Sequence, residues 1–157
     1  MNAGETLHRG IELGLGVQLA DAWRLDNSLS YAKHSYEKWS VSDSLDYSGK
    51  EMEAAPRVIG NSRLNYAPAA FNGGRVELEW QHLGSYWRDA ANTSKYGGHN
   101  LLHLRGNYLF DEQTEVFASL SNLLDKRYAE TSGLDNSGPT YNAGLPRNLT
   151  VGVQLRW

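Results

Sequence analysis

The 157-residue sequence contains no cysteine, which excludes a disulfide framework and thiolate metal sites. It also lacks any apolar run near the roughly 18 residues that a membrane-spanning helix requires, and its mean hydropathy is −0.56. A helical membrane protein is therefore excluded. A membrane β-barrel is not, because its strands alternate apolar and polar residues and look soluble on average.

Neither sign of charge dominates, since the formal net charge is −3 and the pI is near 5.9. This gives no basic footprint of the kind that nucleic-acid-binding proteins use, so no nucleic acid partner is expected. The content of 21% charged and 40% hydrophobic residues fits one ordered domain. Residues 1–10 lack the basic start and apolar core of a secretory signal, so if the protein is exported we expect its true beginning to lie upstream.

Amphipathic helical periodicity is missing as well, and the dominant pattern is an alternation of apolar and polar residues with a period of two. The alternation is cleanest in the first and last segments, from Ile11 to Leu19 and from Leu149 to Trp157. It predicts about seven strands, at residues 8–19, 22–36, 57–66, 75–87, 99–110, 114–122 and 148–157.

The predicted connections alternate in length. Short turns at 20–21, 68–74 and 111–113 alternate with longer segments at 37–56, 88–98 and 129–147. Membrane barrels have this arrangement of short periplasmic turns and longer extracellular loops. We therefore predict an all-β chain in which residues 1–157 form one antiparallel up-and-down transmembrane β-barrel segment, part of a larger barrel. In a soluble lipocalin-like barrel the same alternation would turn the apolar face inward.

The two predicted faces differ in chemistry. Aromatic residues on the apolar face lie near the short-turn ends, as in an interfacial girdle: Trp23, Tyr66, Tyr108, Phe110 and Trp157. The opposite face must point to water because it carries Glu12, Arg24, Asp26, Arg57, Arg63, Glu77, Glu79, Arg105, Glu115 and Arg156. The apolar face also carries Arg9 and Lys33, placed where long basic side chains can snorkel, and three further polar exceptions, Asn27, Ser62 and His82.

Two motifs near the end of the chain carry a family resemblance. Residues 121–130 read Ser-Asn-Leu-Leu-Asp-Lys-Arg-Tyr-Ala-Glu, and residues 144–147 read Gly-Leu-Pro-Arg before a strand that ends in an aromatic residue. In this order they resemble the C-terminal signatures of TonB-dependent receptors, and residues 5–13 and 55–57 are similar to the beginnings of other strands in that family. The matching positions are Asn122, Leu123, Leu124, Asp125, Lys126, Tyr128, Pro146, Arg147 and Trp157. Their expected roles are structural: Asp125 supports a turn and Pro146 fixes a backbone angle.

The resemblance implies a receptor of the cell outer membrane that imports a scarce ligand such as a ferric siderophore, haem or cobalamin. It also implies partners: outer-membrane lipid, the remaining barrel strands, a plug domain, the TonB energy-coupling system and, through the last strand, the barrel assembly machinery. Trp157 stands where the family usually has Phe. Because this chain has no plug domain and an open sheet cannot remain in lipid, we expect a fragment that transports nothing alone. Its exposed edges are expected to make the isolated chain aggregate.

Exposed aromatic and arginine residues on loops that a rigid scaffold holds are candidate ligand contacts. The alternative is that they are ordinary solvated loop residues. The candidates are Trp39, Tyr47, Arg88, Tyr96 and Tyr141.

Catalytic and metal-binding patterns are weak. His99 and His103 share a face but lie roughly 13 Å apart on a strand, too far to bind one ion without other elements. No nucleophile motif surrounds Ser85, which His82 and Asp89 would have to assist in a hydrolase. We therefore expect no enzyme activity, metal or cofactor. The alternative functions are a small independent porin-like or structural barrel, a soluble β-protein that binds a ligand, and an outer-membrane enzyme.

Overall fold

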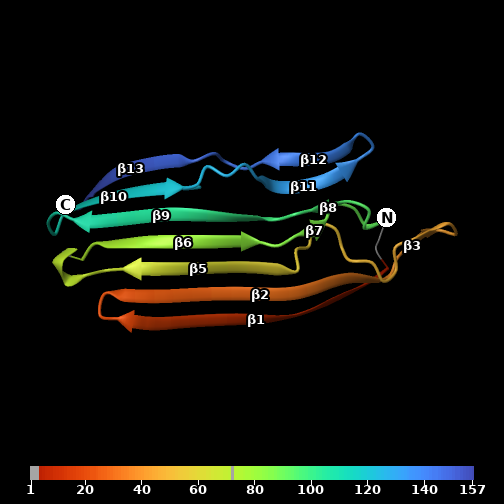
Figure 1. The fold of residues 1–157 in the computed structure, drawn as a ribbon, viewed down its shortest axis with the longest axis horizontal. Coiled ribbons are helices and arrows are strands. Elements are labelled where there is room, and N and C mark those ends of the chain that lie inside the picture. The colour runs from red at the N-terminus through yellow and green to blue at the C-terminus, as the bar shows by residue number, and fades with distance from the viewer. Residues whose placement is uncertain (1–3, 72) are drawn as a thin grey trace.

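The structure is a computed structural model that describes residues 4–71 and 73–157. Within these residues, seven long strands form one antiparallel sheet in which each strand pairs with the next along the chain (Figure 1). In spatial order they are β1 (Glu5–Ala20), β2 (Trp23–Lys38), β5 (Val58–Tyr66), β6 (Arg75–Leu83), β9 (His99–Leu109), β10 (Thr114–Ser121) and β13 (Asn148–Leu155). The predicted antiparallel meander is confirmed.

One predicted strand is too long. The sequence predicts a continuous strand over residues 75–87, but β6 ends at Leu83, and β7 (Tyr86–Trp87) pairs with β8 (Lys95–Tyr96) in a separate hairpin. The break falls at Gly84, whose N–H donates to the Val58 carbonyl over 2.8 Å. A Cβ at position 84 would lie 2.8 Å from the same oxygen. Glycine therefore allows the close backbone contact at the point where the chain leaves β6.

The long connections also contain structure that the sequence pattern does not predict. The first holds the hairpin of β3 (Ser40–Ser42) and β4 (Leu45–Asp46), and the third holds that of β11 (Ala129–Asp135) and β12 (Gly138–Ala143). These strands are short and polar, so their alternation is too brief to stand out. At the end of the chain, the predicted strand over 148–157 is shorter by two residues, since β13 ends at Leu155.

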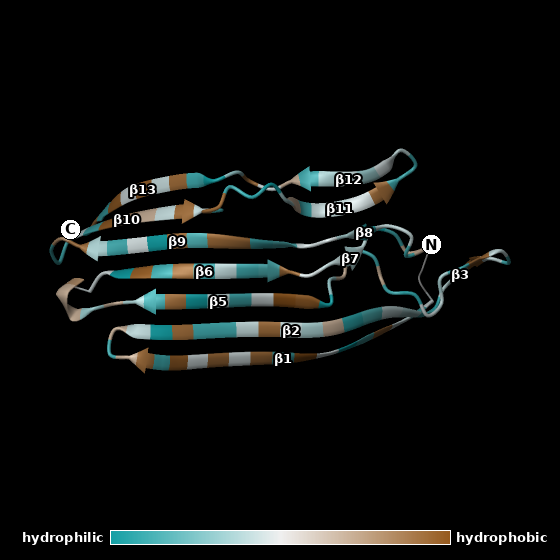
Figure 2. Cartoon of the chain, viewed as in Figure 1, coloured by the Kyte–Doolittle hydropathy of each residue, from teal (hydrophilic) through white to brown (hydrophobic). Residues whose placement is uncertain are grey.

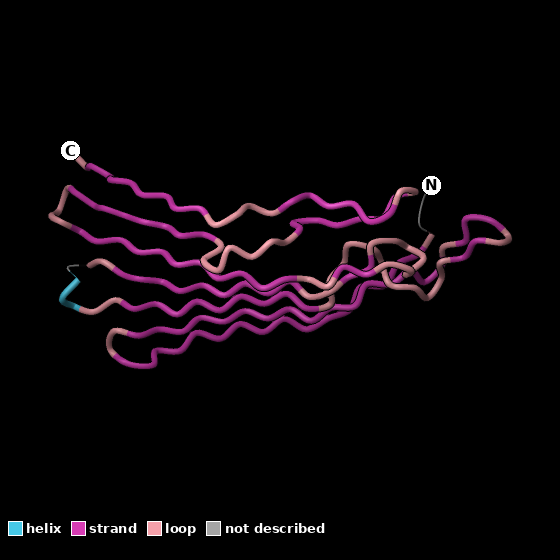
Figure 3. Tube along the Cα trace, turned by 45° about the horizontal axis from the view of Figure 1, so that its top comes forward, coloured by secondary structure: helices cyan, strands magenta, loops and turns pink. Residues whose placement is uncertain are grey.

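The two ends of the sheet differ. At the turn end lie the Asp21–Ala22 turn, the turn that contains the 3-10 helix η1 (Ala69–Phe71), and the turn at Asp111, while the three hairpins lie at the opposite, loop end (Figures 1 and 3). Asn72, inside the turn predicted at 68–74, lies outside the described residues, as do residues 1–3 at the start of the chain. The predicted alternation of short turns with long loops is confirmed.

The sheet has one apolar face, and its residues align from strand to strand. Figure 2 shows the alternating hydrophobic and hydrophilic bands. One aliphatic row crosses the whole sheet through directly paired positions: Val17, Leu25, Leu64, Leu78, Leu104, Leu120 and Leu149. Leu13 and Val151 on this face are 62% and 64% exposed. A contiguous apolar surface of this extent marks a face that meets lipid or another protein.

No helix among the described residues is long and apolar enough to cross a membrane.

The three polar exceptions on the apolar face acquire partners in the fold. The Ser62 hydroxyl donates to the Asn27 side-chain oxygen over 2.6 Å across β2 and β5. His82 Nδ1 lies 2.8 Å from the Asn100 side-chain oxygen, which also accepts from the Trp80 indole N–H over 3.1 Å. Each of these polar side chains therefore has a hydrogen-bond partner, which lowers the free-energy cost of placing it on an apolar surface.

Aromatic rings gather at the turn end of the apolar face, as expected for a girdle. Trp23 and Tyr66 lie on neighbouring strands with ring centroids 4.4 Å apart, and Phe71 of η1 extends the group at 5.8 Å from Tyr66. Tyr108 and Phe110 form a second pair at 5.6 Å.

Candidate functional site

Arg88 is the centre of a cluster that joins two hairpins at the loop end. Its Nε donates to the Ser132 hydroxyl over 2.7 Å, and its Nη1 donates to the Ser94 hydroxyl and the Lys95 carbonyl over 3.0 and 2.7 Å. Its Nη2 donates to the Tyr141 hydroxyl over 3.3 Å. These bonds use four of the five N–H donors of the guanidinium. The group is thus held in place with one donor still available.

Tyrosine rings complete this cluster. The guanidinium carbon of Arg88 lies 5.8 Å from the Tyr96 ring centroid and 5.4 Å from that of Tyr141, within the range of cation–π attraction. The buried Tyr96 hydroxyl bonds both the N–H and the carbonyl of Ala129, at 3.2 and 3.1 Å. Three of the five predicted ligand contacts, Arg88, Tyr96 and Tyr141, therefore come together although 53 positions separate the first and the last. Tyr96, however, is only 8% exposed and lies in β8, so it is not the exposed loop residue that the sequence predicts.

A hollow of about 360 Å³ lies beside this cluster, lined by Tyr96, Arg127, Tyr128 and Tyr141 among others. Tyr96 also bonds His99 Nδ1 over 3.0 Å, and His99 belongs to the same side of β9 as the charged residues of the sheet. The hollow therefore lies at the loop end of the charged face. The sequence does not predict Arg127 as a lining residue, because it stands inside the motif at 121–130, whose expected role is structural.

The other two predicted contacts form a separate aromatic group. Trp39 lies 4.9 Å from Tyr47 and 4.4 Å from Tyr36, measured between ring centroids, at the base of the β3–β4 hairpin. Lys50 adds its ammonium 5.9 Å from the Tyr47 centroid. The structure does not bring this group to Arg88.

The two long loops of this region are nevertheless tied together. Lys50 Nζ donates to the Ala91 carbonyl over 2.7 Å, and the Asn92 side chain accepts from the Glu51 N–H and donates to the Glu51 carbonyl over 2.9 and 2.8 Å. Asn92 has a positive φ of 57°, a conformation that asparagine adopts more readily than most residues. Movement of one loop would therefore be transmitted to the other.

Asp89 organises the tip of the β7–β8 hairpin. Its carboxylate accepts from the backbone N–H groups of Thr93 and Ser94 at 2.9 to 3.0 Å, and from the Thr93 hydroxyl at 2.8 Å. Partial burial alone would raise the pKa of Asp89, but these hydrogen bonds outweigh it and lower the pKa below its ordinary value.

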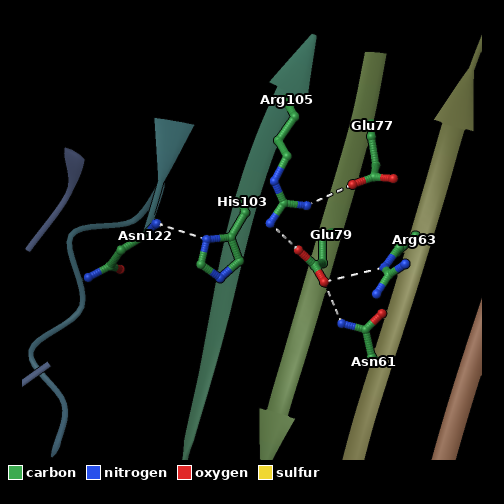
Figure 4. Close-up of polar contacts among 7 residues, drawn as sticks. All are labelled: Asn61, Arg63, Glu77, Glu79, His103, Arg105 and Asn122. Atoms are coloured by element: carbon green, nitrogen blue, oxygen red, sulfur yellow. Dashed lines mark hydrogen bonds and ion pairs between the residues drawn. The ribbon is translucent and has the colours of Figure 1, made fainter. Parts of the chain in front are cut away.

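A network of charges crosses the other face of the sheet (Figure 4). Glu79 is 3% exposed, and its carboxylate accepts from Asn61 over 2.6 Å and from Arg63 over 3.4 Å. Its other oxygen pairs with Arg105 Nη2 at 2.6 Å, while Arg105 Nη1 bonds Glu77 at 2.7 Å. Opposite charges thus meet on three neighbouring strands, which confirms that these four charged residues share one face. The prediction is wrong for Arg57, which precedes β5, pairs with Glu51 at 2.6 Å and lines a hollow together with Tyr31 and His82 of the apolar face.

The motif residue Asn122 is a buried hub, 2% exposed, just after β10. Its side-chain N–H groups donate to the Lys126 and Leu145 carbonyls over 2.9 and 3.0 Å, and its side-chain oxygen accepts from the Lys126 N–H over 2.9 Å. Its backbone N–H donates to His103 Nδ1 over 3.3 Å. Asn122 therefore connects the motif to β9 and to the segment that leads into β13.

Two further contacts hold that segment. Asp125, which has a φ of 52°, accepts from the Arg147 N–H over 2.9 Å and so fixes the start of the last strand. Tyr128 lies flat over Gly144, where a Cβ would come within 2.2 to 2.5 Å of the ring. Both contacts tie the motif to the segment that leads into β13.

The residues considered for chemistry have other partners. His82 bonds Asn100, and Asp89 bonds the tip of its own hairpin. His99 bonds Tyr96, and His103 accepts from Asn122. The structure does not assemble them around Ser85.

A sheet with one apolar and one charged face, short turns at one end and ordered hairpins at the other defines part of the wall of a membrane β-barrel. The family described as TonB dependent receptor-like, beta-barrel, matches residues 1–123. The chain therefore belongs to the family of TonB-dependent receptor β-barrels, and the resemblance is confirmed. Barrels of this family are outer-membrane proteins, so the expected location in the cell outer membrane is confirmed as well.

Solved structures of similar fold are uptake receptors. The ferric citrate transporter FecA matches with a TM-score of 0.80 and 21% identity over 96% of this chain and 24% of its own. The ferric yersiniabactin uptake receptor FyuA from Yersinia pestis matches with 0.79 and 18% over 96% and 23%, and the siderophore receptor PiuA from Acinetobacter baumannii with 0.77 and 18% over 96% and 22%. The chain thus spans about a quarter of the length of these receptors. No curated protein sequence matched it.

Proposed function

We propose that this chain is the C-terminal part of the barrel wall of an outer-membrane receptor that takes up a ferric siderophore or a similar scarce chelate with energy relayed by TonB. The observation that carries the proposal is the two-faced seven-stranded sheet, whose fold agrees over 96% of the chain with a siderophore receptor, a ferric yersiniabactin uptake receptor and a ferric citrate transporter. Residues 1–157 would be one segment of the barrel domain, with the plug and the other strands supplied by the rest of the receptor.

In this arrangement the loop end faces the outside, the charged face lines the lumen and the apolar face meets lipid. The last strand would present Trp157 to the barrel assembly machinery. The seven long strands of the described residues, with their two unpaired edges, favour a segment of a larger barrel over a small independent one, because bacterial single-chain barrels close with an even number of strands. Uptake needs the complete barrel, so the chain alone would not transport.

Ligand contact would take place in the hollow beside Arg88. The free guanidinium donor, the Arg127 side chain and the Tyr96, Tyr128 and Tyr141 rings offer cationic and aromatic contacts to an anionic chelate. Trp39 and Tyr47, on the linked loop, would form an outer contact that the ligand meets first.

The test is chelate-dependent growth of a strain that depends on the complete receptor under iron limitation, together with equilibrium binding of candidate ferric chelates. Arg88→Ala should weaken binding of the transported chelate about ten- to hundredfold, because a charged hydrogen bond contributes about 1.5 to 3 kcal/mol. The affinity of Arg88→Lys should fall between those of the unmodified receptor and Arg88→Ala, because lysine keeps the positive charge but lacks the planar guanidinium.

Arg75→Ala, which removes a cation at the turn end, is the matched control and should bind normally. Normal growth and binding in Arg88→Ala would refute the assignment of the site, and absence of the chain from outer-membrane fractions would refute the function.

A further inference from the structure

Two histidines face each other across the first two strands. His8 of β1 and His34 of β2 are direct cross-strand partners, with Nδ1 atoms 2.7 Å apart and ring centroids 4.9 Å apart. The pairing runs without a shift from this pair to that of Gln18 with Arg24, so the histidines share the charged face with Arg24. Because 26 positions separate them along the chain, the sequence pattern does not predict that they meet.

The second nitrogen of His8 indicates the protonation state of its ring. His8 Nε2 lies 3.2 Å from the Thr6 hydroxyl oxygen, and we assign to His8 the tautomer whose Nε2–H donates to that hydroxyl. His8 Nδ1 is then an acceptor, and the Nδ1–H of His34 donates to it. Metal-binding histidines are oriented in the same way, with one nitrogen hydrogen-bonded to an outer partner and the lone pair of the other presented to the ion.

The surroundings of the pair leave space on one side. The next pair toward the turn end is Gly10 with Ala32, whose side chains do not extend beyond Cβ, and His8 is exposed. On the other side stands Tyr36, which is buried and donates its hydroxyl to Glu53 over 2.5 Å. A hydrated ion therefore has room beside the imidazoles, and Glu53 adds negative charge to this end of the face.

The basic residues of this region are balanced or lie on the other face. Lys38 comes four positions after His34, roughly 13 Å along the strand, and its ammonium pairs with Glu5 at 2.9 Å. Arg9 and Lys33 are the chain neighbours of the histidines, so their side chains alternate to the apolar face.

The distance between the two nitrogens favours one coordination geometry. Two adjacent ligands of a square-planar ion, with metal–nitrogen bonds of about 2.0 Å, lie about 2.8 Å apart, whereas two ligands of a tetrahedral ion lie about 3.3 Å apart. The observed 2.7 Å is close to the square-planar value. Square-planar coordination by nitrogen and oxygen is typical of Cu²⁺ and Ni²⁺, and a given site binds Cu²⁺ more tightly than Ni²⁺ or Zn²⁺.

We propose that His8 and His34 form a two-histidine binding site for Cu²⁺ at the loop end of the charged face. Rotation about χ2, which has broad minima in histidine, turns both Nδ1 lone pairs toward one point. Cu²⁺ replaces the proton on His34 Nδ1, and a proton is taken up at His34 Nε2, so both rings are neutral ligands and no net proton is released. The described residues offer no group of three histidine, aspartate or glutamate side chains that could hold an ion, so water would occupy the remaining positions.

This site goes beyond the uptake of a chelate, because its ligand is the hydrated ion and its residues are separate from the hollow beside Arg88. The experiment uses the complete receptor that carries this chain, purified in detergent without a histidine tag. Cu²⁺ binding is measured by isothermal titration calorimetry at neutral pH, and the ligands are identified by electron paramagnetic resonance, in which coordinated imidazole nitrogens split the copper signal.

His8→Ala and His34→Ala should each weaken Cu²⁺ binding at this site at least tenfold, because even an outer partner of a metal ligand contributes about ten- to hundredfold. Both variants should also lose the splitting that two coordinated nitrogens produce. Thr6→Val keeps both ligands and should weaken binding about tenfold through the loss of the His8 Nε2 partner. It keeps the test decisive if the loss of a histidine disturbs the strand pair.

The matched control is His82→Ala, which removes a histidine from the apolar face and should bind Cu²⁺ as the unmodified receptor does. Equal Cu²⁺ binding by the unmodified receptor and the double variant His8→Ala/His34→Ala would overturn the site. Equal affinity for Zn²⁺ and Cu²⁺ would overturn the assignment to copper. Neither result bears on chelate uptake, which the Arg88 variants test separately.

Discussion

Single residues decide how the last strand is attached. Asn122 is buried in a left-handed conformation with a φ of 50°, and its side chain bonds two separate carbonyls and one N–H. Few side chains other than asparagine combine a tolerance of this backbone geometry with both a donor and an acceptor. This physical demand explains why the motif has asparagine at this position.

Asn122→Ala should destabilise the folded receptor by about 2 to 4 kcal/mol, because three side-chain hydrogen bonds of a buried residue are lost and the Lys126 and Leu145 carbonyls lose their donor. The measurement is the temperature at which the folded band disappears in semi-native gel electrophoresis. Asn142→Ala is the control: it removes one exposed bond, from Asn142 to the Thr131 hydroxyl at 2.7 Å, and should change the temperature little. Equal effects of the two substitutions would contradict the role of Asn122.

Asp89 makes the β7–β8 hairpin sensitive to acid. Because its pKa is lower in the folded than in the unfolded chain, its contribution to stability is complete above the unfolded value of about 3.9 and is lost as the pH falls through the folded value. We expect the fluorescence of Trp87, at the base of the hairpin, to change below about pH 4 while the sheet stays folded. Asp89→Asn should abolish this transition; an unchanged transition would assign it to another group.

At the scale of elements, the sheet is held by cross-strand pairs of two kinds, aliphatic on one face and charged on the other. Glu79 of β6 is the most buried member of the charged network, whereas its partners Arg63 and Arg105 are 52% and 42% exposed. If Glu79 is removed, the exposed arginines can still be hydrated by water. If an arginine is removed, water cannot take its place beside the buried Glu79 carboxylate. The cost of breaking the network therefore depends on which partner is removed.

Arg105→Met should destabilise the sheet by about 2 to 4 kcal/mol, since it removes the 2.6 Å partner of a buried carboxylate. Arg63→Met, which removes only a 3.4 Å contact, should cost about 1 kcal/mol or less. Urea unfolding in lipid vesicles measures both. Adding Glu79→Gln to Arg105→Met should recover part of the loss, and no recovery would show that the cost has another origin.

The long strands follow from the sequence pattern, whereas the short hairpin strands do not. The seven long strands and the faces of Leu13, Glu79 and Val151 follow from a period of two, because a strand with different environments on its two faces fixes its own register. The hairpin strands of two to seven residues are too short for such a pattern. The Arg88 cluster depends on contacts between residues 44 to 53 positions apart, so its residue types were predictable but its assembly was not.

For the whole molecule, the edges of the sheet set the behaviour of the chain. Among the described residues, β1 pairs only with β2 and β13 only with β10, so each leaves one row of backbone groups without a strand partner. In a complete barrel the adjoining strands would cover these rows. The isolated chain is therefore expected to form oligomers in detergent micelles, which analytical ultracentrifugation measures. A stable monomer there would contradict this reading of the edges.

In the complete barrel, the apolar face of this sheet is expected to meet lipid while the charged face lines a watery lumen. Because the sequence has no cysteine, single cysteines can be placed in the complete receptor and tested in intact cells with a water-soluble maleimide. Cysteine at Thr150, on the charged side of β13, and at Ser137, in the β11–β12 hairpin, should be labelled. Cysteine at Val151 and at Leu13 should be protected. Protection of the cysteine at Thr150 with labelling of those at Val151 and Leu13 would show that the apolar face is not the lipid face.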